Sequence, residues 1–171
     1  MVQYPARLEC DVTLDDDRIL HLRPIRPDDA PRLRELYERL SPESLYYRFF
    51  SPVPPPTDRQ LRMLTDIDYD QRMALVATTG DDVVGVARYD RNRADAFAAE
   101  VAVIVQDDLQ RHGLGTTLMM RLAEVAHERG VARFTATVLP ENQRVLGLFE
   151  RSFDVTHELV DGNLRLEFPI T

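Results

Sequence analysis

Two glycines at the start of a long amphipathic segment have the type and spacing that suit anion binding. They lie in the run QRHGLG, residues 110–115, between an apolar stretch that ends at Val105 and a helical pattern that continues to Arg129. A loop that enters a helix presents unpaired N–H groups and the positive end of the helix dipole. Glycine lacks the Cβ atom that would keep an anion away from these amides. The run therefore predicts a site for a phosphate or a diphosphate.

Two common nucleotide-binding patterns do not fit this run. A P-loop needs a lysine after its last glycine, and all 21 basic residues of the chain are arginine. A dinucleotide-binding fold needs three glycines after the first strand of a βαβ unit, whereas here two glycines follow several strands of antiparallel type. What remains is the pattern Gln-x-x-Gly-x-Gly, preceded by a strand that carries a glutamate.

That glutamate, Glu100, is the second residue whose chemistry the sequence singles out. Alternation along the strand places Glu100 on one face with Ala102 and Ile104. We therefore expect a partly buried carboxylate, which is costly unless something offsets its desolvation. The alternative interpretation is an exposed glutamate on an edge strand, paired with an arginine.

The elements that must position these residues alternate between strands and helices. Strands are expected over residues 19–25, 73–79, 83–89, 97–105, 133–138, 155–160 and 164–168. Helices are expected after Asp29 and over residues 42–50, 57–65, 113–129 and 142–152. This order predicts an α/β (α+β) fold, with a mixed, mostly antiparallel seven-stranded sheet and helices on both faces. We expect residues 1–18 to form an N-terminal extension and residues 19–171 to form a single domain.

Composition narrows the classes of protein and partner. The 21 basic and 29 acidic residues give a net charge of −8, so no binding to nucleic acid is expected. No run approaches the roughly 20 apolar residues that span a bilayer, and residues 1–10 hold no secretory signal. We therefore expect a cytoplasmic protein without membrane contact. The lone cysteine, Cys10, can form neither an intrachain disulfide nor a thiolate metal site, and no metal is expected.

The glycine run resembles the acetyl-CoA-binding signature of the GNAT superfamily of N-acetyltransferases. It has the form Gln110-x-x-Gly113-x-Gly115, is preceded by Val103-x-Val105 and is followed by an amphipathic helix. Asn142 and the helix after it resemble the second motif of that family, and the likeness covers residues 19–168. The resemblance implies a GNAT fold and acetyl-CoA as co-substrate. The residues it assigns to acetyl-CoA are Val103, Val105, Gln110, Arg111, His112, Gly113, Leu114, Gly115, Thr116 and Asn142.

The roles within this set differ. The resemblance implies that backbone amides of residues 110–116 hold the diphosphate of CoA, and that the strand with Val103 and Val105 pairs with the pantetheine arm. Arg111 is either a phosphate contact or a solvated arginine. His112 is expected to be a loop residue rather than a catalyst. Asn142 either contacts the pantetheine arm or is a plain helix N-cap.

A narrower similarity concerns residues 22–29 (LRPIRPDD), 40–44 (LSPES) and 48–50 (RFF). These segments resemble the catalytic domain of bacterial protein lysine acetyltransferases of the Pat type. The similarity implies that the acceptor is a protein lysine, for example on an acyl-CoA synthetase. An ammonium with a pKa of about 10.4 costs roughly 4 kcal/mol to deprotonate at pH 7. The reaction therefore needs a general base, and the resemblance places Glu100 in that role.

Two alternatives stay open: a small amine acceptor, such as a polyamine, an amino acid or an antibiotic, and a domain that binds CoA without turnover. Many GNAT enzymes carry a tyrosine that protonates the departing thiolate at the position of Phe149, and phenylalanine has no proton to give. The acid for the leaving group is therefore unassigned, with solvent as the default. The aromatic run at residues 46–50 is expected to form a wall of the acceptor site.

Overall fold

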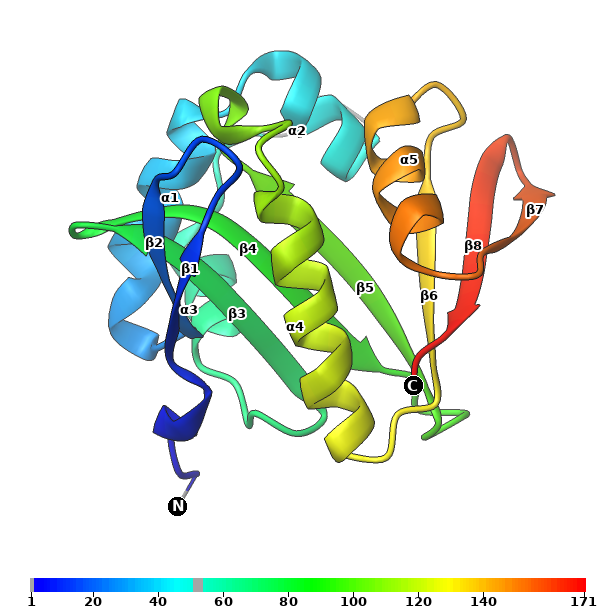
Figure 1. Cartoon of the computed structure of the whole chain (residues 1–171), viewed down its shortest axis with the longest axis horizontal. Coiled ribbons are helices and arrows are strands. Elements are labelled where there is room, and N and C mark those ends of the chain that lie inside the picture. Colours follow the sequence, from blue (N-terminus) through cyan, green and yellow to red (C-terminus); the bar gives the residue numbers. More distant parts are fainter. Residues whose placement is uncertain (1, 51–53) are drawn as a thin grey trace.

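Strands from the N-terminal, central and C-terminal parts of the chain assemble into a single sheet (Figure 1). The computed structural model describes residues 2–50 and 54–171, and within these residues the sheet has eight strands. Their order is β1-β2-β3-β4-β5-β6-β8-β7. The strands are β1 (Cys10–Thr13), β2 (Ile19–Pro24), β3 (Arg72–Thr79), β4 (Asp82–Arg91), β5 (Ala98–Val105), β6 (Arg133–Val138), β7 (Thr156–Val160) and β8 (Asn163–Pro169).

The eighth strand, β1, corrects the expectation of seven. It lies inside the segment 1–18 that the sequence predicted as an N-terminal extension, and it pairs antiparallel with β2 from Cys10↔Leu22 to Thr13↔Ile19. Only four residues long and half exposed, β1 has too weak an alternation to be recognised alone. Its pairing with β2 brings the turn after Thr13 next to the glycine run, because the Asp15 N–H donates to the His112 carbonyl at 3.2 Å.

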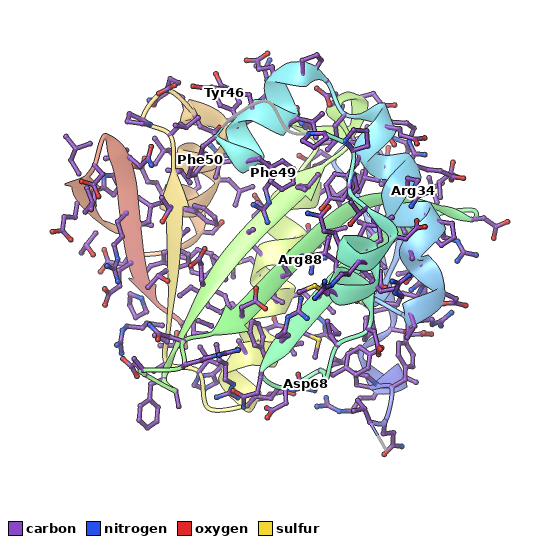
Figure 2. The ribbon with its side chains drawn as sticks, turned by 180° about the vertical axis from the view of Figure 1, so that it is seen from behind. Arg34, Tyr46, Phe49, Phe50, Asp68 and Arg88 are labelled. Atoms are coloured by element: carbon purple, nitrogen blue, oxygen red, sulfur yellow. The ribbon has the colours of Figure 1, made fainter. Side chains whose placement is uncertain are left out.

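Helices cover both faces of the sheet, as the sequence predicted. They are α1 (Ala30–Arg39), α2 (Pro42–Phe49), α3 (Asp58–Thr65), α4 (Leu114–Glu128) and α5 (Gln143–Ser152). Figure 1 shows α4 and α5 in front of the sheet, and the reverse view in Figure 2 shows the helices α1–α3 on the other face. The apolar face of α4 is buried through Leu114, Leu118, Leu122 and Val125, and each such side chain contributes about 1.5–3 kcal/mol. No described helix is both long enough and apolar enough to cross a membrane.

The central strands β5 and β6 run parallel and separate after a short contact. Their register covers only Ala98–Glu100 against Arg133–Thr135, whereas β4 pairs with β5 as far as Val105. On its other edge β6 pairs with β8 from Arg133 to Val138, but its pairing with β5 ends at Glu100, so beyond Glu100 no described strand lies against this edge of β5. Figure 1 shows the two strands diverging toward the space between α4 and α5. The glycine run enters α4 at this open end.

An ion pair is buried at the start of α1. Two nitrogens of Arg23 donate to the two carboxylate oxygens of Asp29 at 2.7 Å each, and the N–H of Arg26 donates to the same carboxylate at 2.8 Å. Asp29 is therefore engaged by Arg23 and Arg26, and its side chain makes no capping hydrogen bond to the backbone of α1. Burial alone would raise the pKa of Asp29, but these hydrogen bonds outweigh it and hold the pKa below its usual value.

Candidate active site

A cleft of about 970 Å³ follows the gap between β5 and β6. Its lining includes residues from β5, the glycine run, the start of α5 and the helix α2 on the opposite face of the sheet. Glu100 and all of the residues that the sequence assigned to acetyl-CoA line this cleft except Leu114, whose side chain is 1% exposed and packs in the core. Leu114 can therefore contribute its backbone N–H to a ligand but not its side chain.

The glycine run presents a row of free backbone donors at the mouth of the cleft. The helix α4 begins at Leu114, and the first helical hydrogen bond runs from the Thr117 N–H to the Gly113 carbonyl at 3.0 Å. Within the described residues, no acceptor pairs with the N–H groups of residues 111–116. These groups and the dipole of a 15-residue helix suit a polyanion such as a diphosphate.

Both glycines are required by this geometry. Gly113 has a φ of 87°, in the left-handed region that favours glycine, and it is the N-cap of α4. A Cβ on Gly113 would lie 3.2 Å from an oxygen of Asp15. A Cβ on Gly115 would lie 2.6 Å from Cδ1 of Leu148, so α5 packs closely against the first turn of α4.

Side-chain hydrogen bonds connect the loop before the glycine run to its surroundings. Gln110 donates through Nε2 to the Val105 carbonyl at 2.9 Å, while its Oε1 is buried without a hydrogen-bond partner among the described residues. Asp107 accepts from the hydroxyls of Ser41 at 2.7 Å and Ser44 at 3.0 Å. Burial would raise the pKa of Asp107, but these hydrogen bonds lower it below its usual value. The loop is thereby fixed to the start of α2.

The two charged residues of the glycine run differ in their surroundings. Arg111 has a φ of 68° and is exposed, with no ion pair among the described residues. The Nδ1 atom of His112 lies 3.7 Å from a carboxylate oxygen of Asp16. Asp16 belongs to the turn between β1 and β2, so His112 contacts a neighbouring turn. Asp15 on the same turn places a further carboxylate beside Gly113. The β1–β2 turn was not predicted to adjoin this site, and its acidic side chains oppose an anion there.

Three more of the predicted residues line the cleft, with contacts that are compatible with either of the roles considered for each. Val103 and Val105 are half-buried, line the cleft and share one face of β5, the face toward α4. Asn142 is buried and is the N-cap of α5, where its Oδ1 accepts from the Val145 N–H at 3.3 Å. Because Asn142 also lines the cleft, its capping role leaves its side-chain NH₂ group for a ligand.

Glu100 is exposed, which differs from the partly buried carboxylate that the sequence predicted. It occupies the last register pair of β5 with β6, opposite Thr135, and solvent reaches it where the strands begin to separate. Glu100 makes no hydrogen bond or ion pair with any described residue, so the alternative of a glutamate paired with an arginine is not seen either. The neighbouring carboxylate, Asp90 on β4, accepts from Nε of Arg72 at 2.9 Å.

The side of the cleft formed by α2 and β4 carries the aromatic run and two arginines. Tyr47, Phe49 and Phe50 line the cleft as expected for its wall, whereas Tyr46 is exposed outside it. Arg88 on β4 also lines the cleft and was not predicted, although it is the one charged residue in the apolar run 83–89. Figure 2 shows Phe49, Phe50 and Arg88 on the same face of the sheet. Burial lowers the pKa of the Arg88 guanidinium.

Phe149 borders the cleft and also packs in the core. Its side chain is 1% exposed, and its ring centroid lies 5.3 Å from that of Phe168. Phe153 stacks on the other side of Phe168 at 4.6 Å. A phenylalanine at this position therefore holds α5 on the sheet through aromatic packing.

Comparison with known proteins identifies the family. Residues 31–154 match the model of the acetyltransferase (GNAT) family. The chain is 38% identical over 122 residues to an acetyltransferase of Pseudomonas aeruginosa, covering 69% of this chain and 65% of that protein. It is also 38% identical over 133 residues to acetyltransferase Pat of Mycolicibacterium smegmatis, covering 77% of this chain and 40% of Pat. The chain thus spans less than two thirds of the length of either relative.

Solved structures agree with the sequence relatives. The GNAT domain of S. lividans PAT superposes with a TM-score of 0.92 at 40% identity, covering 98% of this chain and all of that domain (100%). A cAMP-binding acyltransferase from Mycobacterium smegmatis gives a TM-score of 0.69 at 30% identity, covering 95% of this chain and 47% of that protein. Together with the open strand edge and the glycine run, these matches show that the chain belongs to the acetyltransferase (GNAT) family.

Proposed function

We propose that this enzyme transfers the acetyl group of acetyl-CoA directly to the side-chain amine of a protein lysine, with Glu100 as the general base. The observation that carries the proposal is the position of Glu100, exposed in the cleft where β5 and β6 separate. With no described hydrogen-bond partner, the carboxylate is available to take a proton directly or through one water. The neighbouring Asp90 is already paired with Arg72.

The residues that line the cleft fit acetyl-CoA. The free N–H groups of residues 111–116 suit the diphosphate, and the open edge of β5 near Val103 and Val105 suits the amides of the pantetheine arm. The unpartnered Oε1 of Gln110 is a buried acceptor in need of a donor. A volume of about 970 Å³ is enough for such a ligand. Acetyl-CoA supplies the activated acyl group.

The chain's own groups account for two of the three catalytic requirements. Backbone N–H groups on the open edge of β5 can stabilise the developing oxyanion, a contribution of about 10²–10³ in rate. Glu100 accepts the proton that the lysine ammonium must lose. The third requirement is a proton for the departing thiolate, which Phe149 cannot supply because its side chain is apolar and buried. We assign that proton to solvent.

A protein acceptor is supported by the likeness to Pat-type enzymes. The segments 22–29, 40–44 and 48–50 carry that likeness, and the structure places the last of them in the wall of the cleft. The 38% identity to Pat and the 40% identity to the S. lividans PAT domain favour the same acceptor class. We take an acyl-CoA synthetase as the first partner to test.

The test follows acetyl-CoA consumption by purified enzyme with a lysine-bearing partner. We expect Glu100→Gln to lower kcat/KM about 10²–10⁴-fold, the usual contribution of a general base. Asp90→Asn is the matched control, because it removes a charge on the same sheet face and should change kcat/KM only a few-fold. Equal turnover by the Glu100→Gln variant and the original enzyme would refute the assignment of the base.

Mass spectrometry of enzyme-treated cell lysate separates the two acceptor classes. New acetyl-lysine on partner proteins is the expected result. Turnover of polyamines, amino acids or antibiotics without new acetyl-lysine would show that the acceptor is a small amine.

A further inference from the structure

The side chain of Arg88 is a buried cation that the proposed reaction does not use. Arg88 is 8% exposed, and its Nη1 donates weakly to the Leu64 carbonyl at 3.3 Å. Its Nη2 is buried and has no hydrogen-bond partner among the described residues. An arginine stays charged in a protein, so this position holds a positive charge with unsatisfied donors in the lining of the cleft.

A second guanidinium stands nearby on α2. Arg48 also lines the cleft, and its Nε is buried without a hydrogen-bond partner among the described residues. Its guanidinium lies over the ring of Phe49, 4.9 Å from the centroid. Burial lowers the pKa of Arg88, and the positive charge of Arg48 adds to this effect, which places the two guanidinium groups near each other.

No carboxylate of the described residues forms an ion pair with either arginine. Neither Arg48 nor Arg88 has a carboxylate of a described residue within 4.0 Å, and Asp90, whose charge acts on Arg88, is paired with Arg72. The shortage is unusual in a chain with 29 acidic and 21 basic residues. Leaving a buried charge unpaired is costly, so such a position is consistent with a partner that arrives with the substrate.

The register of the sheet fixes the spacing between the backbone positions of Arg88 and Glu100. Arg88 pairs with Ala102, and Asp90 pairs with Glu100, so Arg88 and Glu100 are diagonal neighbours on one face. Diagonal neighbours in an antiparallel pair are about 7–8 Å apart. In an extended peptide, side chains two residues apart point the same way and are separated by about 7 Å. The spacing between Arg88 and Glu100 therefore matches the spacing between two side chains of an extended peptide that are two residues apart.

We infer that Arg88, assisted by Arg48, binds a carboxylate of the acceptor, supplied by an acidic residue two positions from the lysine that is acetylated. This inference rests on the proposed function, because it takes the acceptor to be a peptide segment whose lysine reaches Glu100. The acceptor is favoured over the acyl donor as the source, because Arg88 and α2 lie on the sheet face opposite to α4, whose first turn suits the diphosphate.

The experiment compares lysine peptides that differ in one residue. One peptide carries Glu two positions from the lysine, its partner carries Gln there, and a third carries Glu directly beside the lysine. We expect the first to exceed the second in kcat/KM by about ten- to hundredfold, the range for a hydrogen bond to a charged group. The third peptide should resemble the second, since its carboxylate points to the other face.

Three variants identify the residue responsible. Arg88→Met should remove the preference, so that the Glu and Gln peptides react with the same kcat/KM. Arg48→Met, at a half-buried position on α2, should reduce the preference and serves if Arg88→Met fails to fold. Arg34→Met is the matched control, because Arg34 is paired with Asp58 on the outer side of α1 and should keep the full preference.

Each result that differs from these expectations contradicts either the inference about Arg88 or the proposed function. Equal rates with the Glu and Gln peptides would refute the inference and leave the proposed function intact. Turnover of neither peptide, together with turnover of small amines, would refute the proposed function itself. Equal loss of activity on all peptides in Arg88→Met would show a structural role only. A preference for succinyl-CoA over acetyl-CoA that Arg88→Met abolishes would assign the carboxylate to the acyl donor.

Discussion

Replacing Gly113 by alanine should weaken the binding of CoA far more than it destabilises the fold. Gly113 has a φ of 87° and caps the helix whose free N–H groups face the cleft. An added Cβ would lie 3.2 Å from Asp15, whose turn is hydrogen-bonded to the His112 carbonyl. Relief of this crowding must rotate the peptide groups that would hold the diphosphate.

The magnitudes follow from the same geometry. A left-handed conformation costs a non-glycine residue about 1–2 kcal/mol. At about 2–4 °C per kcal/mol for a chain of this size, Gly113→Ala should melt about 2–8 °C lower. Misdirecting one N–H that bonds a phosphate costs a further 1.5–3 kcal/mol of binding, so Kd should rise by about tenfold or more.

Gly130→Ala is the matched control for this prediction. Gly130 has a φ of 85°, lies just beyond the other end of α4, and has no atom within 4 Å of an added Cβ. It should show the same loss of Tm and an unchanged Kd, when CoA binding is followed by calorimetry and unfolding by circular dichroism. An equal Kd for Gly113→Ala and Gly130→Ala would refute the assignment of the glycine run to the diphosphate.

Two further predictions concern charges. Asp29→Asn should destabilise the fold by about 3–5 kcal/mol at pH 7, measured by chemical denaturation, because it leaves Arg23 buried without its counter-ion. Since the pKa of Asp29 is lowered on folding, this stabilisation is complete above the unfolded value near 3.9 and is lost as the pH falls through the folded value. The gap between the two proteins should therefore narrow in acid, and a constant gap would refute the linkage. Asp15→Asn should tighten CoA binding about two- to fivefold at low salt and less at high salt, and an effect independent of salt would show that repulsion is not the cause.

The periodicity of apolar residues was sufficient to predict the elements whose sequence pattern is strong. The pattern predicted a helix over residues 113–129, and α4 spans Leu114–Glu128; β6 has the predicted bounds of 133 and 138. The strand β1 was missed because its four residues are stabilised by pairing with β2 rather than by local preference. For the same reason the acidic turn after Thr13 could not be placed beside the glycine run from sequence alone.

To predict that Glu100 is exposed and Arg88 is buried, one must know the register of the sheet. Glu100 has apolar neighbours in sequence, which suggests burial, yet the end of the β5–β6 contact exposes it to the cleft. Arg88 interrupts an apolar strand, a signal that sequence reasoning had available and did not use. Its position relative to Glu100 depends on the pairing of β4 with β5, a long-range property that no local pattern encodes.

The two faces of the sheet offer different groups for the binding of an anionic ligand. A chain of net charge −8 repels both a polyanionic donor and an acidic acceptor at long range, so each must be held by local donors. On the α4 face, unpaired amides and a helix dipole bind without a cationic side chain, which suits a diphosphate whose several oxygens can meet several N–H groups. On the α2 face, a fixed guanidinium suits a single carboxylate, because its planar donors match two oxygens at one orientation. The two faces communicate where β6 leaves β5 at Glu100, so the proposed acetyl transfer takes place at this opening.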